Sequence, residues 1–337
     1  MKHAISLRIG PVGFRVGSAW PGPISALAHL YHGYPAPHDR IADFTVRLEP
    51  ERPWRRWIRP SVAIHGDYTL AEAIPMALAH GLLAAEMGMN LQMALGQRRY
   101  LLLHAAVVER GGRALILTGE SGAGKSTLAA LLGERNWRLM GDEFALVDLL
   151  SGMVHAFPRA ISLKNEAIGV MEAEAAAARF GTRLEGTPKG AIRHLRPRDD
   201  AIAHMDEPAR PALILFPRFG FASAIRPIGA AEIFMRLTQA STNYVALGQP
   251  GFAALSGLCI APQITIRNNL AQGSLRAGTA TEAFTWLSLA ATVGASAGAA
   301  AVGPLVEAQG WRLGAVVAVV MTAAATAVLF LRREVLA

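Results

Sequence analysis

A glycine-rich stretch near the middle of the chain combines the residue types that bind phosphate. It reads Gly119-Glu-Ser-Gly-Ala-Gly-Lys-Ser126 and satisfies the pattern G-x-x-x-x-G-K-[ST]. In that pattern, glycines let successive backbone N–H groups face an anion, the lysine reaches the β- and γ-phosphates, and the following hydroxyl binds Mg²⁺. We therefore expect nucleotide binding by Gly119, Glu120, Ser121, Gly122, Ala123, Gly124, Lys125, Ser126 and Thr127.

A pair of acids follows this stretch at a spacing that suits the same site. Asp142 and Glu143 lie within Trp137–Val147, where one apolar strand should end and another begin. In an open α/β sheet, ligands bind outside the carboxyl ends of the strands. A carboxylate there can hold Mg²⁺ or accept a proton from an attacking hydroxyl. We expect Ser126, Asp142 and Glu143 to be the metal ligands, the alternative for the two acids being a solvated turn.

The surrounding sequence predicts the elements that position these residues. Around the glycine-rich stretch we expect one buried strand, a turn, a second strand and a helix, at Tyr100–Val108, 109–113, Ala114–Thr118 and Thr127–Glu134. Nearer the N-terminus, apolar and polar residues alternate as in half-buried strands at Ile5–Ile9 and Phe44–Leu48. Residues 70–96 are rich in helix formers and predict a helix.

The composition excludes several classes of protein. The chain has 337 residues, of which 52% are hydrophobic and 17% charged, so it is neither disordered nor fibrous. The net charge of +8 fits an acidic partner without establishing one, and Cys259 is the single cysteine. A disulfide within the chain and a cysteine-based zinc site are therefore excluded.

The apolar excess is concentrated near the C-terminus. Ala283–Val306 and Leu313–Leu331 are 24 and 19 residues without a charge, separated by a short polar break. Two such spans predict a helical membrane hairpin. Flanking arginines would place both of its ends in the cytoplasm, while residues 1–17 predict no secretory signal. A pair of buried Ala/Gly-rich helices is the alternative, but we expect residues 283–331 to anchor a cytoplasmic protein to the inner membrane.

A second distinctive segment interleaves arginine with tryptophan. Residues 51–60 read Glu-Arg-Pro-Trp-Arg-Arg-Trp-Ile-Arg-Pro. Such a run could bind nucleic acid or anionic lipid. We favour a solvated turn with both indoles folded onto the domain, and we expect no nucleic-acid partner.

The motifs together resemble a known group of enzymes. His104, the stretch Gly119–Ser126 and Gly141-Asp-Glu143 are similar to the HPr kinase/phosphorylase group, which shares its phosphate-loop core with phosphoenolpyruvate carboxykinase. The chain more closely resembles the HprK-related kinase A family, and the likeness spans residues 1–260. It includes Ala42–Leu48, Arg55–Pro60, Leu101–Val108, Ser162–Asn165, Thr187–Gly190, His194–Pro197, Asp206–Pro211, Phe216–Arg218 and Thr242–Gly248.

The resemblance implies roles for individual residues. Asp142 matches the base that deprotonates the substrate serine, Lys125 the phosphate-binding lysine, and His104 a histidine on the strand before the loop. We therefore expect Asp142, Lys125 and His104 to be catalytic, with ATP and Mg²⁺ as cofactors. The group's metal-binding glutamate is missing, since Ser162 stands near its place. Either Glu143 or Glu166 replaces it, or the metal has fewer ligands; Lys164 and Lys189 are further phosphate or substrate candidates.

These expectations define the predicted architecture. We expect an α/β fold: a small N-terminal α+β domain at 1–95, an HPr kinase-like phosphate-loop domain at 96–260 and the membrane hairpin at 261–337. The tail resembles the last two helices of a major facilitator transporter, too few for a transport path. The expected function is phosphoryl transfer from ATP to a Ser/Thr hydroxyl of a protein or peptide. A non-catalytic ATP-binding switch or chaperone is the alternative, a transporter fragment is the third reading, and homo-oligomerisation is left open.

Overall fold

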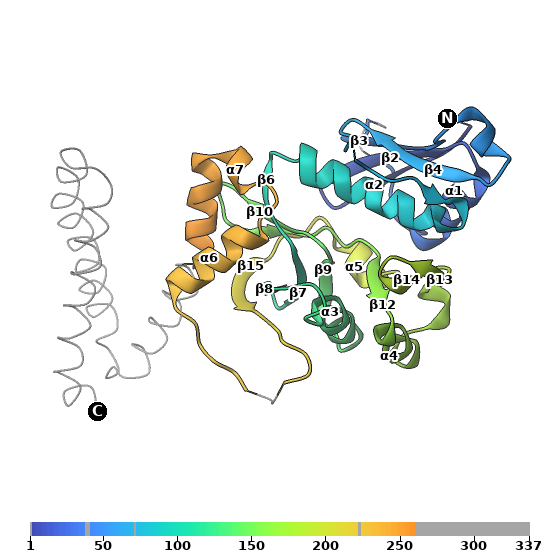
Figure 1. Ribbon diagram of the computed structural model, residues 1–337. Helices are drawn as coiled ribbons and strands as arrows, with labels where there is room; N and C mark the ends of the chain where they lie inside the picture. The colour runs from blue at the N-terminus through green and yellow to red at the C-terminus, as the bar shows by residue number, and fades with distance from the viewer. Residues whose placement is uncertain (1, 38–40, 71, 222–223, 260–337) are drawn as a thin grey trace, which may run out of the picture. The chain divides into compact units, whose positions relative to one another are not determined.

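The computed structural model describes residues 2–37, 41–70, 72–221 and 224–259. The contacts of the chain divide it into two compact units, Met1–Gln263 and Ile264–Ala337. All described residues belong to the first unit, and the domain boundary predicted near residue 95 falls inside it. This unit is a mixed α/β structure with several sheets (Figure 1).

The predicted membrane spans, residues 283–331, lie outside the described residues. Among the helices that are described, none combines the length and the apolar character needed to cross a bilayer.

The N-terminal part is built around a five-stranded sheet. Its strands occur in the order β1 (His3–Ile9), β2 (Val12–Ser18), β3 (Phe44–Pro50), β4 (Ser61–Gly66) and β5 (Met76–Ala77). The strands predicted at Ile5–Ile9 and Phe44–Leu48 are confirmed as parts of β1 and β3. In β3, Phe44, Val46 and Leu48 are buried, as the period of two requires. Helix α1 (Pro21–Leu30) follows β2, and α2 (Gly81–Gly96) packs against β3 and β4.

The helix predicted over residues 70–96 is shorter than expected. It begins at Gly81, after the strand β5 and a 3₁₀ turn, η3 (Leu78–His80). Pro75 disfavours helical dihedrals in the residue before it, and Met76 and Ala77 pair with β4 instead of joining the helix. The helix-forming residues before Pro75 therefore could not extend the helix.

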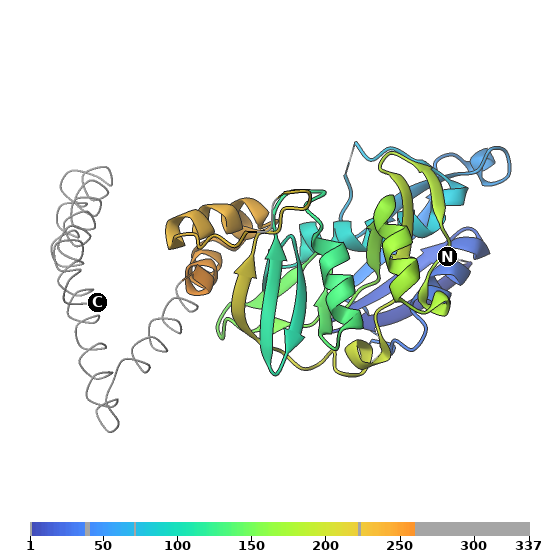
Figure 2. The ribbon, with the colours of Figure 1, turned by 90° about the horizontal axis from the view of Figure 1, so that it is seen from below.

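A four-stranded sheet forms the centre of the second part. It contains β7 (Ala105–Arg110), β8 (Arg113–Thr118), β9 (Arg138–Gly141) and β15 (Arg210–Leu215), in the order β15-β8-β7-β9. One face packs through Val108, Leu115 and Leu117 on α3 (Lys125–Glu134). The residues that alternate with these point to the opposite face of the sheet and pack with the segment that contains α6 (Ala230–Ala240). The sheet therefore lies between helices, with α3 beside it in Figures 1 and 2.

The strand predicted at Tyr100–Val108 is interrupted at His104. Residues Tyr100–Leu103 form β6, which pairs with β10 (Ala145–Asp148), whereas β7 belongs to the four-stranded sheet. The backbone N–H of His104 donates to Ala240 O at 2.7 Å instead of to a strand. A single polar residue, His104, marks the switch between sheets, and the apolar residues on both sides of it predicted one strand. The helix predicted at Thr127–Glu134 is confirmed, and α3 begins two residues earlier.

The remaining elements surround these two sheets. A further sheet has the order β12-β14-β13, with β12 (Ile161–Lys164), β14 (Gly190–Leu195) and β13 (Leu184–Thr187). Shorter elements are β11 (Val154–His155), α4 (Glu166–Glu174), η4 (Ala177–Arg179), α5 (Asp199–Ala203) and α7 (Tyr244–Leu247). A buried ion pair between Arg159 and Glu86 links α2 to the segment before β12.

The turn between β1 and β2 fits closely against a distant backbone. Gly10 has a φ of +52°, and a Cβ there would lie 1.9 Å from Ala156 O. Gly152 has a φ of +68° but open space around it. Both alanine variants incur about 1 kcal/mol of left-handed strain. Gly10→Ala should lose about 1–3 kcal/mol more in free energy of unfolding, because the neighbouring backbone must move.

Urea unfolding of Gly10→Ala and Gly152→Ala would measure this difference. Equal losses in the two variants would show that the turn does not make the close contact.

Candidate functional site

Three segments of the four-stranded sheet meet at one edge. Strand β7 runs antiparallel to β8 and to β9, so β8 and β9 are parallel and end at the same edge. The chain leaves β8 at Thr118 and β9 at Gly141, and it enters β7 from His104. The glycine-rich stretch, the acidic pair and His104 are therefore brought together, as Asp142 beside Ser126 and His104 beside Glu143 show.

The glycine-rich loop contains three glycines with positive φ. It joins β8 to α3, and Gly119, Gly122 and Gly124 have φ values of +137°, +84° and +87°. Such angles are readily adopted only by glycine. The N-terminus of α3 begins at Lys125, with Ser126 and Thr127 in its first turn. Unpaired N–H groups and the helix dipole make such a terminus attractive to anions.

Lys125 is held inside the loop that precedes it. Its side chain is buried, and its Nζ donates to Gly119 O at 2.8 Å and to Glu120 O at 2.9 Å. Burial lowers the pKa of Lys125, and the nearby charges of Asp142 and Glu143 raise it in part. The ammonium group is thus positioned at the loop, and both of its hydrogen bonds within the described part of the chain go to main-chain carbonyls.

Asp142 is a buried carboxylate directly beside the start of α3. It is 2% exposed, and its Oδ1 accepts a hydrogen bond of 2.9 Å from Ser126 Oγ. Its Oδ2 accepts from the backbone N–H of Ser162 at 3.3 Å. Burial, and then the charge of Glu143, raise the pKa of Asp142 to about 6. A carboxyl group with such a pKa is ionised at neutral pH and well suited to accept a proton.

Glu143 and His104 form the outer part of the site. Glu143 Oε2 lies 3.4 Å from His104 Nδ1, and Glu143 has a φ of +75°, which is unusual for a residue with a side chain. Burial lowers the pKa of His104, although Glu143 opposes this effect. His104 is therefore neutral at neutral pH and can act as a donor or an acceptor.

The structure also places the secondary candidates. Lys164, on β12, is close enough to act on the pKa of Asp142 and of Lys125. Lys189 is exposed in the β13–β14 turn, where its carbonyl accepts from Asn165 Nδ2 at 3.3 Å. Glu166 is exposed in the first turn of α4. Of the two acids considered as replacements for the missing glutamate, Glu143 is the one that acts on Asp142.

Two contacts of the site were not predicted from the sequence. The first is the backbone N–H of Ser162, which comes from a different sheet and fixes Asp142. The second is Phe219, in the segment after β15, because a Cβ on Gly124 would lie 3.6 Å from its Cβ. Strand β15 is parallel to β8, so the chain that follows it also emerges at the glycine-rich loop. A pairing between strands so distant in sequence leaves no local signal.

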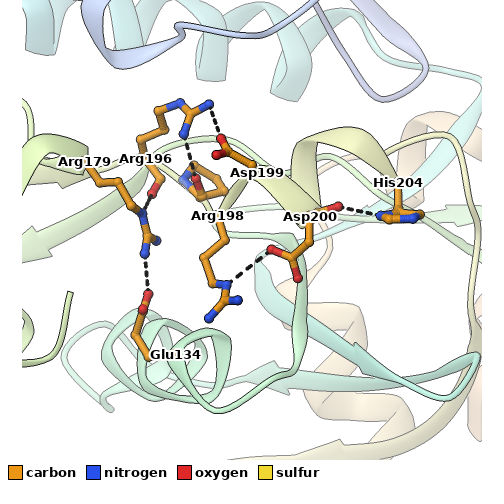
Figure 3. A network of polar contacts seen from close by, with 8 residues as sticks. Glu134, Arg179, Arg196, Arg198, Asp199, Asp200 and His204 are labelled. Atoms are coloured by element: carbon orange, nitrogen blue, oxygen red, sulfur yellow. Dashed lines mark hydrogen bonds and ion pairs between the residues drawn. The ribbon is translucent and has the colours of Figure 1, made fainter. Parts of the chain in front are cut away.

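A cavity of about 720 Å³ elsewhere in the unit has a different character. It is lined by residues from 8–35 and 178–206, among them Arg8, Arg179 and Arg196. Each of these arginines already has a carboxylate partner: Asp206, Glu134 and Asp199 respectively. Figure 3 shows the chain of contacts from Glu134 through Arg179 to Arg196 and Asp199, and the separate contacts of Arg198, Asp200 and His204. Since these guanidinium charges are balanced, the cavity is a weaker candidate for a ligand site than the glycine-rich loop and the acidic pair.

Comparison with known proteins does not identify the chain. No protein-family model matches the sequence, and no curated protein matches it either. Support for a function therefore comes from the geometry of the glycine-rich loop, the acidic pair and His104.

Proposed function

We propose that the chain is an ATP-dependent kinase of the HPr kinase type, which transfers the γ-phosphoryl group of ATP to a Ser or Thr hydroxyl of a protein or peptide. The observation that carries the proposal is the contact between Asp142 and Ser126, directly after a glycine-rich loop that holds Lys125. This contact combines a phosphate-binding element with a buried acid of raised pKa. In finer detail, we propose a phosphate-loop core of the HPr kinase/phosphoenolpyruvate carboxykinase kind.

The loop would bind the nucleotide through its main chain. Glycines at positive φ allow the N–H groups of residues 119–126 to point toward a phosphate, and the positive end of α3 adds to the attraction. Lys125 Nζ would exchange its bonds to the Gly119 and Glu120 carbonyls for phosphate oxygens. Charge-assisted bonds of this kind are about twice as strong as neutral ones.

The residues fit a magnesium ion that is held partly by its substrate. Ser126, Asp142 and Glu143 offer oxygen atoms, the ligands that Mg²⁺ prefers. Within the described ranges, no three His, Cys, Asp or Glu side chains form a metal cluster. Mg²⁺ commonly uses one or two carboxylates together with substrate phosphates and water. When bound, the ion would neutralise charge on the β- and γ-phosphates.

The protein's own residues account for proton transfer and charge. Asp142 would accept the proton of the acceptor hydroxyl, since its pKa of about 6 keeps it ionised but basic at neutral pH. Ser126 and the Ser162 N–H hold the carboxylate in one orientation. Lys125 would offset the negative charge of the transferring phosphoryl group. His104 would help to orient the Glu143 side chain through the contact of its Nδ1 with Oε2 at 3.4 Å.

The remaining parts of the proposal concern location. We propose that the enzyme works in the cytoplasm and is anchored to the inner membrane by residues 283–331. The support is the pair of uncharged stretches in the sequence. Two helices cannot form a transport path, so a transporter fragment is not favoured.

Incubation of the full chain with γ-labelled ATP, Mg²⁺ and cell extract would test the proposal. We expect label on Ser or Thr of an acceptor protein, and none with the Lys125→Met variant. If the chain binds ATP but no phosphoprotein forms, the alternative function, an ATP-binding switch or chaperone, would replace the kinase. If it binds no nucleoside triphosphate, both functions are wrong.

A further inference from the structure

The segment between β3 and β4 exposes large apolar side chains. We call residues 51–60 the Arg-Trp loop; it contains the 3₁₀ turn η2 (Pro53–Arg56). Trp54, Trp57 and Ile58 are 52%, 74% and 66% exposed. The expectation that both indoles fold onto the domain was therefore wrong. Figure 2 shows the chain leaving the five-stranded sheet between these strands.

The base of the Arg-Trp loop is fixed, although its tip is exposed. Trp20 Nε1 donates to Arg56 O at 2.9 Å, and Arg56 Nη2 donates to Ala19 O at 3.0 Å. Within the loop, the N–H of Ile58 donates to Trp54 O at 3.0 Å. Arg59 has a φ of +45°, which turns the chain back toward β4. The loop thus presents its apolar residues from a defined support, so less backbone entropy is lost when a partner binds.

The charge of the loop is strongly positive. Arg52, Arg55, Arg56 and Arg59 form no ion pair with any described residue. The acid of the run, Glu51, accepts a hydrogen bond from Ser61 Oγ at 3.2 Å. Two exposed indoles, an exposed isoleucine and four arginines without acidic partners in the described part of the chain are therefore gathered in ten residues.

We propose that the Arg-Trp loop is a contact site for the surface of an anionic lipid bilayer. Tryptophan rings favour the interface between water and hydrocarbon, because one edge is polar and the rest apolar. Arginines next to the bilayer are attracted to anionic head groups and can keep their guanidinium groups in the head-group layer. An exposed isoleucine beside them gains from contact with acyl chains.

The arrangement of the rings favours lipid over nucleic acid. The guanidinium of Arg52 lies over the Trp54 ring at 5.5 Å, and that of Arg56 lies over the Trp57 ring at 5.6 Å. Each ring therefore has one face already occupied, whereas binding of single strands relies on open faces on which bases stack. Ile58 has no ring and cannot stack. Insertion into an interface needs only exposed apolar area.

The contact would involve a different sheet from the proposed catalytic site. The Arg-Trp loop joins two strands of the N-terminal sheet, whereas Lys125 and Asp142 lie at the edge of the four-stranded sheet. The proposal does not depend on the kinase reaction or on the C-terminal spans. It can therefore be tested by a signal that comes from the loop alone.

A fluorophore sensitive to polarity, attached at Ile58→Cys in the full chain, would provide that signal. Cys259 would be replaced by alanine to leave one thiol, and Leu150→Cys would serve as the control. Leu150 is 99% exposed, in the turn between β10 and β11. With vesicles of phosphatidylcholine and phosphatidylglycerol, emission at position 58 should shift to the blue, whereas emission at position 150 should not.

The charges of the loop should control this shift. Arg52→Gln and Arg59→Gln should each weaken the equilibrium between loop and bilayer about fivefold, and together about 25-fold. High salt should have a similar effect. Arg56 is left unchanged, because it supports the base of the loop. Thermal melting of each variant would confirm that the fold is retained.

Several outcomes would overturn the proposal. One is an unchanged emission at position 58 while the chain sediments with the vesicles. A second is an equal shift at position 150. A third is a shift that grows with protein concentration without vesicles, which would indicate a contact between protein chains. The last is a response to a single-stranded oligonucleotide but not to vesicles, which would assign the loop to nucleic acid.

Discussion

Replacement of Lys125 by methionine should weaken nucleotide binding about 100-fold or more. Methionine keeps most of the apolar length of this buried side chain but removes its charge and the donors that now bond to Gly119 O and Glu120 O. Hydrogen bonds from charged groups contribute about 1.5–3 kcal/mol each, so the loss of two gives this factor. Isothermal titration with a non-hydrolysable ATP analogue and Mg²⁺ would measure it.

Two other lysines provide matched controls. Lys164 acts on the pKa of both Lys125 and Asp142, so Lys164→Met should have a smaller effect than Lys125→Met. Lys189 is exposed in a turn, and Lys189→Met should leave affinity within about twofold. If all three variants lose affinity equally, general positive charge would explain binding, and the loop would have no special role.

The glycine-rich loop could be predicted because its structure is determined locally. The glycines at positions 119, 122 and 124 adopt positive φ values, and α3 begins at the lysine that the motif requires. The acidic pair was also placed correctly at the end of a strand, since a change from apolar to polar residues marks that end. These features depend on residues close in sequence.

Other contacts of the site depend on distant parts of the chain. The Ser162 N–H reaches Asp142 from a sheet formed by β12, β14 and β13, and β15 brings Phe219 toward Gly124. The break at His104 depends on Ala240, far along the chain. No pattern near these residues reports such pairings. The period of the hydrophobic residues predicts which face of a strand is buried, but not which sheet the strand joins.

In the fold, too, some features follow from nearby residues and others from distant parts of the chain. Strands β1 and β3 follow from alternation, whereas the helix predicted at residues 70–96 is too long, because Pro75 and the pairing of β5 with β4 interrupt the run of helix formers. The burial of the two indoles was wrong for a different reason. Hydrophobicity alone favours burial of tryptophan, but Trp54 and Trp57 lie in and directly after the 3₁₀ turn η2, where both side chains are exposed. Exposed apolar residues of this kind usually indicate binding.

Replacement of Asp142 by asparagine should reduce phosphoryl transfer by about 10²–10⁴-fold, because the proton acceptor is lost. The fall in affinity for ATP without metal should be much smaller, since Lys125 and the loop are unchanged. Single-turnover transfer from labelled ATP and equilibrium binding would separate the two effects. Glu143→Gln removes a neighbouring acid and a proposed metal ligand but keeps Asp142, so it should retain more transfer than Asp142→Asn. Full transfer by the asparagine variant would exclude Asp142 as the base.

The same substitution should stabilise the metal-free protein at neutral pH. Burial raises the pKa of Asp142 from its ordinary value of 3.8 to about 6, so folding favours the protonated form. A raised carboxyl pKa contributes stability below about pH 4 that is lost as the pH rises through 6. Above that range the folded protein holds a buried ionised carboxylate, which costs up to about 3 kcal/mol. Asparagine does not ionise and avoids this cost.

Urea unfolding near pH 7.5 should therefore show a higher free energy of unfolding for Asp142→Asn than for the unaltered chain. The difference should shrink as the pH falls through 6 and approach zero at about pH 3, where the aspartate is protonated in both states. An acid that serves only the fold should instead lose stability when its charge is removed, since its ionised form would be the stabilising one. A gain in stability combined with a loss of transfer is the result that distinguishes a catalytic carboxylate from a structural one at this position.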